Sequence, residues 1–197
     1  SKVWWRCQGG HVWQATVASR VAGCGCPVCA GRRVLPGEND LASRFPQIAA
    51  QWHPTKNGAL TPRQVTPYAN RRVWWRCPRG HEYRVVVGGR TMGGSGCPYC
   101  AGRRVLAGFN DLATVRPELA KQWHPTLNGA LTPEMVTPGS HRRVWWQCAQ
   151  GHVWQAAVYA RAGKRGSGCP VCAGRVSPRR LERYGRMTAE EREAVQV

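Results

Sequence analysis

The strongest constraint on this chain is a set of paired cysteines and a histidine that occurs three times. In the first copy, Cys7 and His11 are followed after fourteen residues by Cys26 and Cys29 of a Cys-Pro-x-Cys pair. The later copies keep this order, with fifteen and sixteen residues between the His and the second pair. Three thiols and one imidazole form the ligand set of a closed structural zinc site. The predicted ligands of three zinc ions are Cys7, His11, Cys26 and Cys29; Cys77, His81, Cys97 and Cys100; and Cys148, His152, Cys169 and Cys172.

The spacing suits one ion per copy, because a short loop lets both ligands of a pair point at the same metal. A glycine before each His relieves crowding in that loop, and the Pro between the later cysteines fixes one backbone dihedral. Disulfides would leave the recurrent histidines unexplained, and a catalytic zinc would need a coordination position open to water. The tenth cysteine, Cys24, has no counterpart in the other copies. We expect it to be a free thiol, with replacement of Cys26 as a ligand as the alternative.

The repeat also sets the domain organisation. Cys7, Cys77 and Cys148 are 70 and 71 residues apart, and the chain has only two Phe. Small metal-stapled α+β modules are therefore expected in place of one large core. The predicted domains are zinc modules with helix and linker at 1–70 and 71–141, a third zinc module at 142–176, and a helical tail at 177–197 in which Thr188-Ala-Glu-Glu191 predicts a capping box.

Each copy opens on a strand pattern that delivers the first cysteine. A basic residue or pair precedes Val and two adjacent Trp, as in Lys2-Val-Trp4-Trp5, and an alternating second strand follows the His. Adjacent strand residues face opposite sides, so one Trp is expected over the zinc and the other against a helix or linker. Base stacking is the alternative role for these rings. Because the match to the second copy begins at Lys2, a piece of a longer array is one interpretation of the chain.

Short helices are expected between the zinc motifs. In the first copy, Asn39-Asp40-Leu41 predicts an N-cap, and Pro46 predicts a second helix with Pro at its first position. His53 ends that helix and is expected to cap or pack, because no nucleophile or carboxylate recurs beside it. We therefore predict no enzyme and no catalytic residue. The equivalents in the second copy are Asn110-Asp111-Leu112, Pro117 and His124.

The formal net charge of +19 indicates a polyanionic partner. Of the 29 basic residues, 25 are arginine, which favours planar bidentate contacts to phosphate and guanine. A GC-rich genome is an alternative source of the arginine excess, and solvated or capping arginines are the alternative for each position. The predicted nucleic-acid contacts are Arg20, Arg32, Arg33, Arg71, Arg72, Arg90, Arg103, Arg104, Arg142, Arg143, Arg161, Lys164 and Arg165.

The order Trp-Trp-x-Cys-x-x-Gly-His, an aromatic strand, Gly-Cys-Pro-x-Cys-Ala-Gly, Asn-Asp-Leu and Gln-Trp-His-Pro resembles the treble-clef, or zinc-ribbon, repeat family over residues 2–175. The resemblance implies tandem treble-clef zinc fingers, each with a knuckle, a β-hairpin and a short helix, and it implies the same zinc ligands. It also implies nucleic-acid binding.

These observations favour a zinc-dependent protein that binds double-stranded DNA, with phosphate contacts supplying affinity and base contacts specificity. An RNA or single-strand binder and a zinc-stabilised protein-interaction scaffold are the alternatives. We expect no small-molecule substrate, and the sequence does not fix the oligomeric state. No run of eighteen apolar residues and no leader pattern occurs, so we expect no membrane association. Reduced thiols favour a cytoplasmic location, at the nucleoid in a bacterium.

Overall fold

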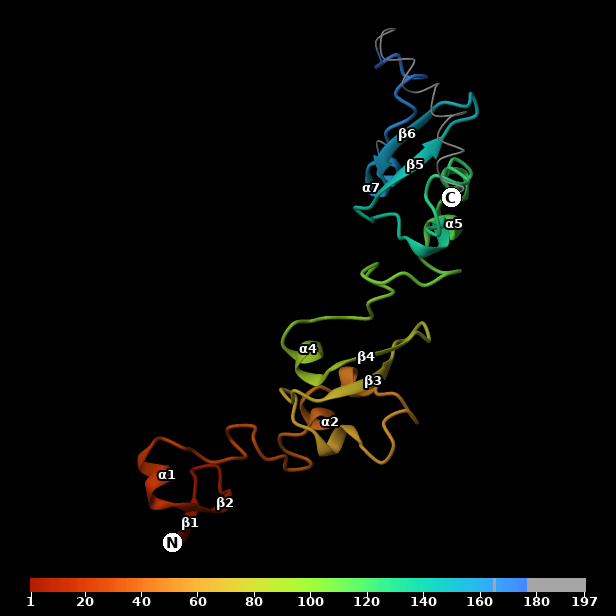
Figure 1. Ribbon diagram of the computed structural model, residues 1–197. Helices are drawn as coiled ribbons and strands as arrows, with labels where there is room; N and C mark the ends of the chain where they lie inside the picture. Colours follow the sequence, from red (N-terminus) through yellow and green to blue (C-terminus); the bar gives the residue numbers. More distant parts are fainter. Residues whose placement is uncertain (165, 177–197) are drawn as a thin grey trace. The chain divides into compact units, whose positions relative to one another are not determined.

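Three antiparallel hairpins carry the zinc motifs (Figure 1). In each hairpin the second Trp of the pair lies opposite an aromatic residue of the other strand, with Trp5 opposite Trp13, Trp75 opposite Tyr83, and Trp146 opposite Trp154. The strands are β1 (Lys2–Arg6) with β2 (Val12–Thr16), β3 (Arg72–Arg76) with β4 (Glu82–Val86), and β5 (Arg143–Gln147) with β6 (Val153–Ala157).

The computed structural model describes residues 1–164 and 166–176. Within the chain, packing separates two units, Ser1–Cys97 and Pro98–Val197. The predicted helical tail at 177–197, with its capping box at Thr188, lies outside the described residues, as does Arg165.

A short helix follows the second strand of every hairpin, where the sequence predicted only an alternating strand. These helices are α1 (Val17–Val21), α4 (Val87–Thr91) and α7 (Val158–Ala162). The Thr16 side chain caps α1 by accepting a hydrogen bond from the Ser19 backbone N–H at 3.1 Å. Five residues are too few to show a helical period, which is why the alternating pattern concealed them. A hairpin, a small helix and a Cys/His cluster in each module confirm the expected fold class.

The segments between the zinc motifs form three short turns of helix each. In the first unit these are α2 (Leu41–Arg44), α3 (Pro46–Ala49) and the 3₁₀ turn η1 (Pro62–Gln64). In the second unit they are α5 (Leu112–Val115), α6 (Pro117–Ala120) and η2 (Pro133–Met135). The predicted N-caps are confirmed at Asp40 and Asp111, and both prolines open their helices as expected. We call residues 39–66 and 110–137 the linker segments.

Asp111 shows how the caps are built. Its carboxylate accepts hydrogen bonds from the backbone N–H of Thr114 at 2.9 Å and of Gly108 at 2.7 Å, and the residue is fully buried. Burial raises the pKa of this carboxyl, but the hydrogen bonds outweigh it and hold the pKa below its usual range. A charged acceptor at a helix start satisfies backbone donors that have no partner within the helix.

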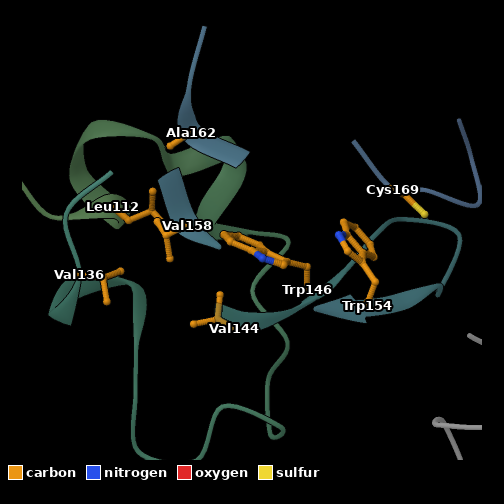
Figure 2. Close-up of a cluster of buried hydrophobic side chains, with 8 residues drawn as sticks. All are labelled: Leu112, Val136, Val144, Trp146, Trp154, Val158, Ala162 and Cys169. Carbon is orange, nitrogen blue, oxygen red and sulfur yellow. The ribbon is translucent and has the colours of Figure 1, made fainter. Parts of the chain in front are cut away.

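Each linker segment packs against the hairpin that follows it. In the second unit, Leu112 and Val136 of the linker meet Val144, Trp146 and Val158 in one buried cluster (Figure 2). The Trp123 ring meets Trp146 edge to face, with ring centroids 5.4 Å apart. Each packed unit thus combines a linker with the zinc hairpin after it, whereas the predicted modules combined a hairpin with the linker that follows it.

The second linker segment also forms hydrogen bonds along the outer edge of β5, the first strand of the hairpin that it covers. The His124 backbone N–H donates to the Trp145 carbonyl at 3.1 Å, and the Gln147 N–H donates to the Gln122 carbonyl at 2.7 Å. The Asn128 amide pairs with both backbone groups of Trp145, at 2.8 and 2.9 Å. The linker therefore satisfies polar groups that an edge strand would otherwise present to solvent.

The prediction that one Trp of each pair packs on the linker and the other on the metal cluster is confirmed only for the linker. Trp146 faces the linker, as expected, but the ring beside the cysteines is Trp154 of β6, which lies next to Cys169 (Figure 2). Trp13 of β2 packs with Cys26 in the first module in the same way. In the first and third modules, the aromatic residue beside the cysteines thus comes from the second strand.

The buried linker leucine provides a test of this packing. Leu112 is fully buried, so Leu112→Ala should lower the free energy of unfolding by about 2–5 kcal/mol. Val115→Ala is the control, because Val115 is 46 % exposed and its loss should change the value by less than about 0.5 kcal/mol. Urea denaturation of the zinc-loaded protein measures both, and equal effects would show that the linker does not share the core.

Candidate metal centres

Each module brings three thiols and one imidazole together. In every group the four ligand atoms lie within 4.8 Å of one another, and the groups contain the twelve ligands predicted from the sequence. Cys24 is in none of them, so Cys26 is the ligand in the first module.

Two tight turns hold the ligands in place. In the first turn of module one, the Gly10 backbone N–H donates to the Cys7 carbonyl at 3.0 Å, and the Cys7 N–H donates to the His11 carbonyl at 3.1 Å. Gly10 has φ +83°, a conformation that side chains disfavour, which explains the glycine before each His. The second turn follows the small helix, where the Ala30 N–H donates to the Cys26 carbonyl at 2.9 Å.

The histidines present one particular nitrogen to the thiols. His11 Nδ1 lies 3.3 Å from the Sγ atoms of Cys7 and Cys29 and 3.6 Å from that of Cys26. Nδ1 is therefore the ligand atom, and Nε2 faces away from the cluster. In the other two modules as well, the His Nδ1 lies against the thiols, at 3.4 to 3.6 Å.

Glu38 orients the first of these histidines. Its carboxylate accepts a hydrogen bond from His11 Nε2. This bond raises the pKa of His11 to about 9, against the opposing effect of burial. A carboxylate on the distal nitrogen fixes the tautomer and strengthens an imidazole as a metal ligand. The second copy has Phe109 at this position, so the carboxylate is a feature of the first centre.

The thiols differ in how readily they lose a proton before a metal binds. Burial raises the pKa of Cys7, but hydrogen bonds from His11 and the neighbouring thiols outweigh it and lower the pKa to about 7. Burial also raises the pKa of Cys148, but hydrogen bonds with the Gln150 and His152 backbone and with the His152 and Cys172 side chains outweigh it and lower the pKa to about 7. Hydrogen bonding with Cys26 and Cys7 raises the pKa of Cys29 to about 11. In the first and third sites, one thiolate is thus ready to capture a cation near neutral pH.

The donor set fits zinc. Three thiolates and one imidazole nitrogen, converging from two turns, provide four ligands and leave no coordination position for a substrate. A bound ion would cross-link the hairpin to the turn after the small helix in a module with few buried residues. Three closed sites on hairpin modules define the chain as a tandem zinc-finger protein.

Comparison with protein families agrees with this class. The family model described as "Probable Treble clef zinc finger domain" matches residues 1–32, 48–103 and 119–175, so the chain belongs to that family. No curated protein matches the chain. Among the described residues, no helix is long and apolar enough to cross a membrane.

The arginine nine residues after each His has a structural position that corrects one prediction. Arg90 and Arg161 were expected to contact nucleic acid, but they are only 7 % and 8 % exposed. The Arg90 guanidinium lies over the Trp75 and Tyr83 rings and donates to the Ser95 carbonyl and the Gln51 side chain, at 2.8 and 2.5 Å. The guanidinium groups of Arg90 and Arg161 therefore form contacts within the protein.

Arg20 and Arg161 occupy the same place in the first and third modules. Arg161 lies over the rings of Trp146 and Trp154 and donates to the Ser167 carbonyl and the Gln122 side chain. Burial lowers the pKa of Arg161, and the charges of Cys169 and Cys148 oppose that effect. A zinc ion with three thiolates carries a net negative charge, which this cation would offset. Arg20 is half-buried and donates to the Cys24 carbonyl at 2.6 Å, and its contact with nucleic acid remains a prediction.

The other predicted nucleic-acid contacts within the described residues are exposed, and they remain predictions. They are Arg32, Arg33, Arg71, Arg72, Arg103, Arg104, Arg142, Arg143 and Lys164.

His53 packs as predicted. It is buried, and its Nδ1 accepts hydrogen bonds from the backbone N–H groups of Thr55 and Lys56, while Nε2 donates to Glu82 at 2.8 Å. Lys56 pairs with the same carboxylate. The second linker has Leu127 in place of Lys56 and the following hairpin has Val153 in place of Glu82, so the two positions of this ion pair are apolar in the other repeat.

Sequence reasoning missed several residues that support the centres. Asn39 was predicted only as part of a cap, but its amide donates to the Val28 carbonyl at 2.9 Å and ties the loop after the second cysteine pair to the site. Gln51 and Glu38 also escaped notice. The repeated Gln-Trp pair was the available signal for Gln51, whereas Glu38 occurs in one copy and gave none.

We expect Glu38→Gln to weaken zinc binding at one site of the three. Loss of the carboxylate behind His11 should lower the affinity of that site about 10- to 100-fold. Chelator competition on the three-zinc protein should then show one ion released early, with two unchanged. Glu134→Gln, an exposed carboxylate in η2, is the control. Early release of all three ions would contradict a local role.

The thiol pKa values predict how zinc affinity depends on pH. Protons compete with the metal for the thiolates, so affinity should fall as pH falls. The fall should become steeper below about pH 7, where Cys7 and Cys148 begin to take up protons in addition to Cys29 and Cys172. Chelator competition between pH 6 and 8 tests this, and a constant slope across pH 7 would contradict it.

Proposed function

We propose that the chain binds nucleic acid, with double-stranded DNA as the preferred form, and that zinc holds the modules that present its arginines. The observation that carries the proposal is a cationic hollow of about 280 Å³ in the first unit. Lys56, Arg71, Arg72 and Arg84 line it around Trp74, and no acidic residue belongs to its lining. Such a hollow suits a phosphate group of a polyanion.

The distribution of acidic groups supports the same function. Asp40 and Asp111 are buried as helix caps, while Glu38, Glu82 and Glu118 are bonded to histidine or lysine. The exposed arginines therefore face little competition from carboxylates of the described residues, which are Glu38, Asp40, Glu82, Asp111, Glu118 and Glu134.

Duplex binding is favoured over base stacking in the second module. Trp74 is half-buried, its ring lies under Lys56 at 5.0 Å, and its backbone is bonded to Asn57. The arginine pair at the start of β3, Arg71 and Arg72, recurs at the start of β5 as Arg142 and Arg143, which would place phosphate contacts on two modules. The proposal assigns binding and no catalytic step to these residues.

One observation favours a second candidate, the binding of single strands. Trp4 is 69 % exposed, and Lys2 and Arg6 lie on the same face of β1. An exposed ring between two cations is the arrangement on which unpaired bases stack.

Removal of the arginine pair tests the proposal. At roughly 0.15 M salt, the double variant Arg71→Gln and Arg72→Gln should bind duplex DNA about fivefold more weakly for each phosphate contact that it loses. The slope of the logarithm of the binding constant against the logarithm of the salt concentration should fall by about one for each lost contact. Fluorescence anisotropy on the zinc-loaded protein measures both quantities.

The matched control removes two exposed charges elsewhere, with Arg63→Gln and Lys121→Gln, and should leave the affinity nearly unchanged. Equal losses of affinity in both variants would show that the net charge alone accounts for the interaction. Preference for single strands that disappears in Trp4→Ala would favour the second candidate, and no binding at this salt concentration would leave a protein partner.

A further inference from the structure

The first hairpin exposes the positions that the other two bury. Val3 of β1 is 40 % exposed and Val17 of α1 is 54 % exposed. Their equivalents are Val73 and Val87 in the second module and Val144 and Val158 in the third, and none of these exceeds 2 % exposure. The same residue types therefore occupy a core in two modules and a surface in one.

In the second and third modules, a linker segment covers this face. Leu41 and Val65 of the first linker are 0 % and 4 % exposed, and Trp52 meets Trp75 edge to face with centroids 5.4 Å apart. Each linker precedes the first strand of the hairpin that it covers, and residues 67–71 join the first linker to β3. Within the described residues, no linker segment precedes β1.

The outer edge of β1 is open in the same way. On β3, the His53 N–H donates to the Trp74 carbonyl at 3.1 Å, and the Arg76 N–H donates to the Gln51 carbonyl at 2.8 Å. The equivalent groups on β1 belong to Trp4 and Arg6, and they form no such bonds within the described residues. An edge with free donors and acceptors beside an apolar face can accept another segment of chain.

The buried arginine adds a specific polar contact to this surface. Arg90 donates one bond to its own module and a second to the Gln51 side chain of the linker. Arg20 keeps the first bond, to the Cys24 carbonyl at 2.6 Å, and lies over the Trp5 and Trp13 rings. Among the described residues, no glutamine side chain accepts a second bond from Arg20 as Gln51 does from Arg90.

We propose that Val3, Trp5, Val17, Arg20 and the outer edge of β1 form a docking surface for a linker segment joined directly ahead of Ser1. The occupant has the features that both linkers of this chain share, Gln-Trp-His-Pro-Thr-x-Asn at 51–57 and 122–128. Its Trp packs on Trp5, its Gln accepts from Arg20, and its Asn pairs with the backbone of Trp4.

A fusion tests this surface on the complete chain. A second copy of residues 36–70 is placed ahead of Ser1, so that its junction matches the one before Arg71. Hydrogen exchange at the Trp4 and Arg6 amides should slow by at least about tenfold, because the edge becomes bonded and covered. The β3–β4 hairpin in the same molecule provides the reference for a covered edge.

The control fusion carries Gln→Ala and Trp→Ala at the copied positions of Gln51 and Trp52, and it should restore fast exchange. A further variant, Val17→Asp in the first fusion, should do the same while leaving the β3–β4 amides protected. Unchanged exchange in the unmodified fusion would overturn the proposal. Sedimentation of the original chain supplies the other test, because a dimer that Val3→Asp dissociates would assign this face to a second copy and overturn a linker occupant.

Discussion

Ligand convergence at the three Cys/His clusters is the constraint on which the rest of the structure depends. Each hairpin has five-residue strands, and the helices that follow are equally short, so none would persist without a cross-link. Closing the two turns around one ion sets the hairpin against the small helix and places an aromatic ring over the thiols. The buried arginine can then lie between two rings, where its charge faces the anionic centre.

A second level of order comes from the linker segments, which tie modules into an array. Their helices are too short to be stable alone, and they gain a core by packing on the next hairpin. Capping aspartates start these helices, and the tryptophan and asparagine of each linker complete the sheet edge. The exposed arginines are thereby carried on ordered supports, which is a requirement for phosphate contacts made in a fixed register.

The sequence predicted the metal ligands and the hairpins because both depend on local spacing. Asp111 and Pro117 were equally readable, since capping is a local property. The small helices were missed because five residues carry no period, and Arg90 was misassigned because its burial depends on Gln51, 39 residues away. The offset packing was also hidden, because a repeat period gives the length of a unit and leaves its starting point undefined.

That undefined starting point has an evolutionary consequence. When an array of this kind gains or loses a whole unit, the position of the break decides whether the product is stable. A break between 70 and 71 separates a linker from its hairpin and leaves apolar surface on both parts. A break between Arg33 and Asn39 keeps linker and hairpin together and costs the bonds of Asn39 to the preceding turn and, in the first copy, the bond between Glu38 and His11. Recombination at the second position would yield proteins of different length without a new core having to evolve.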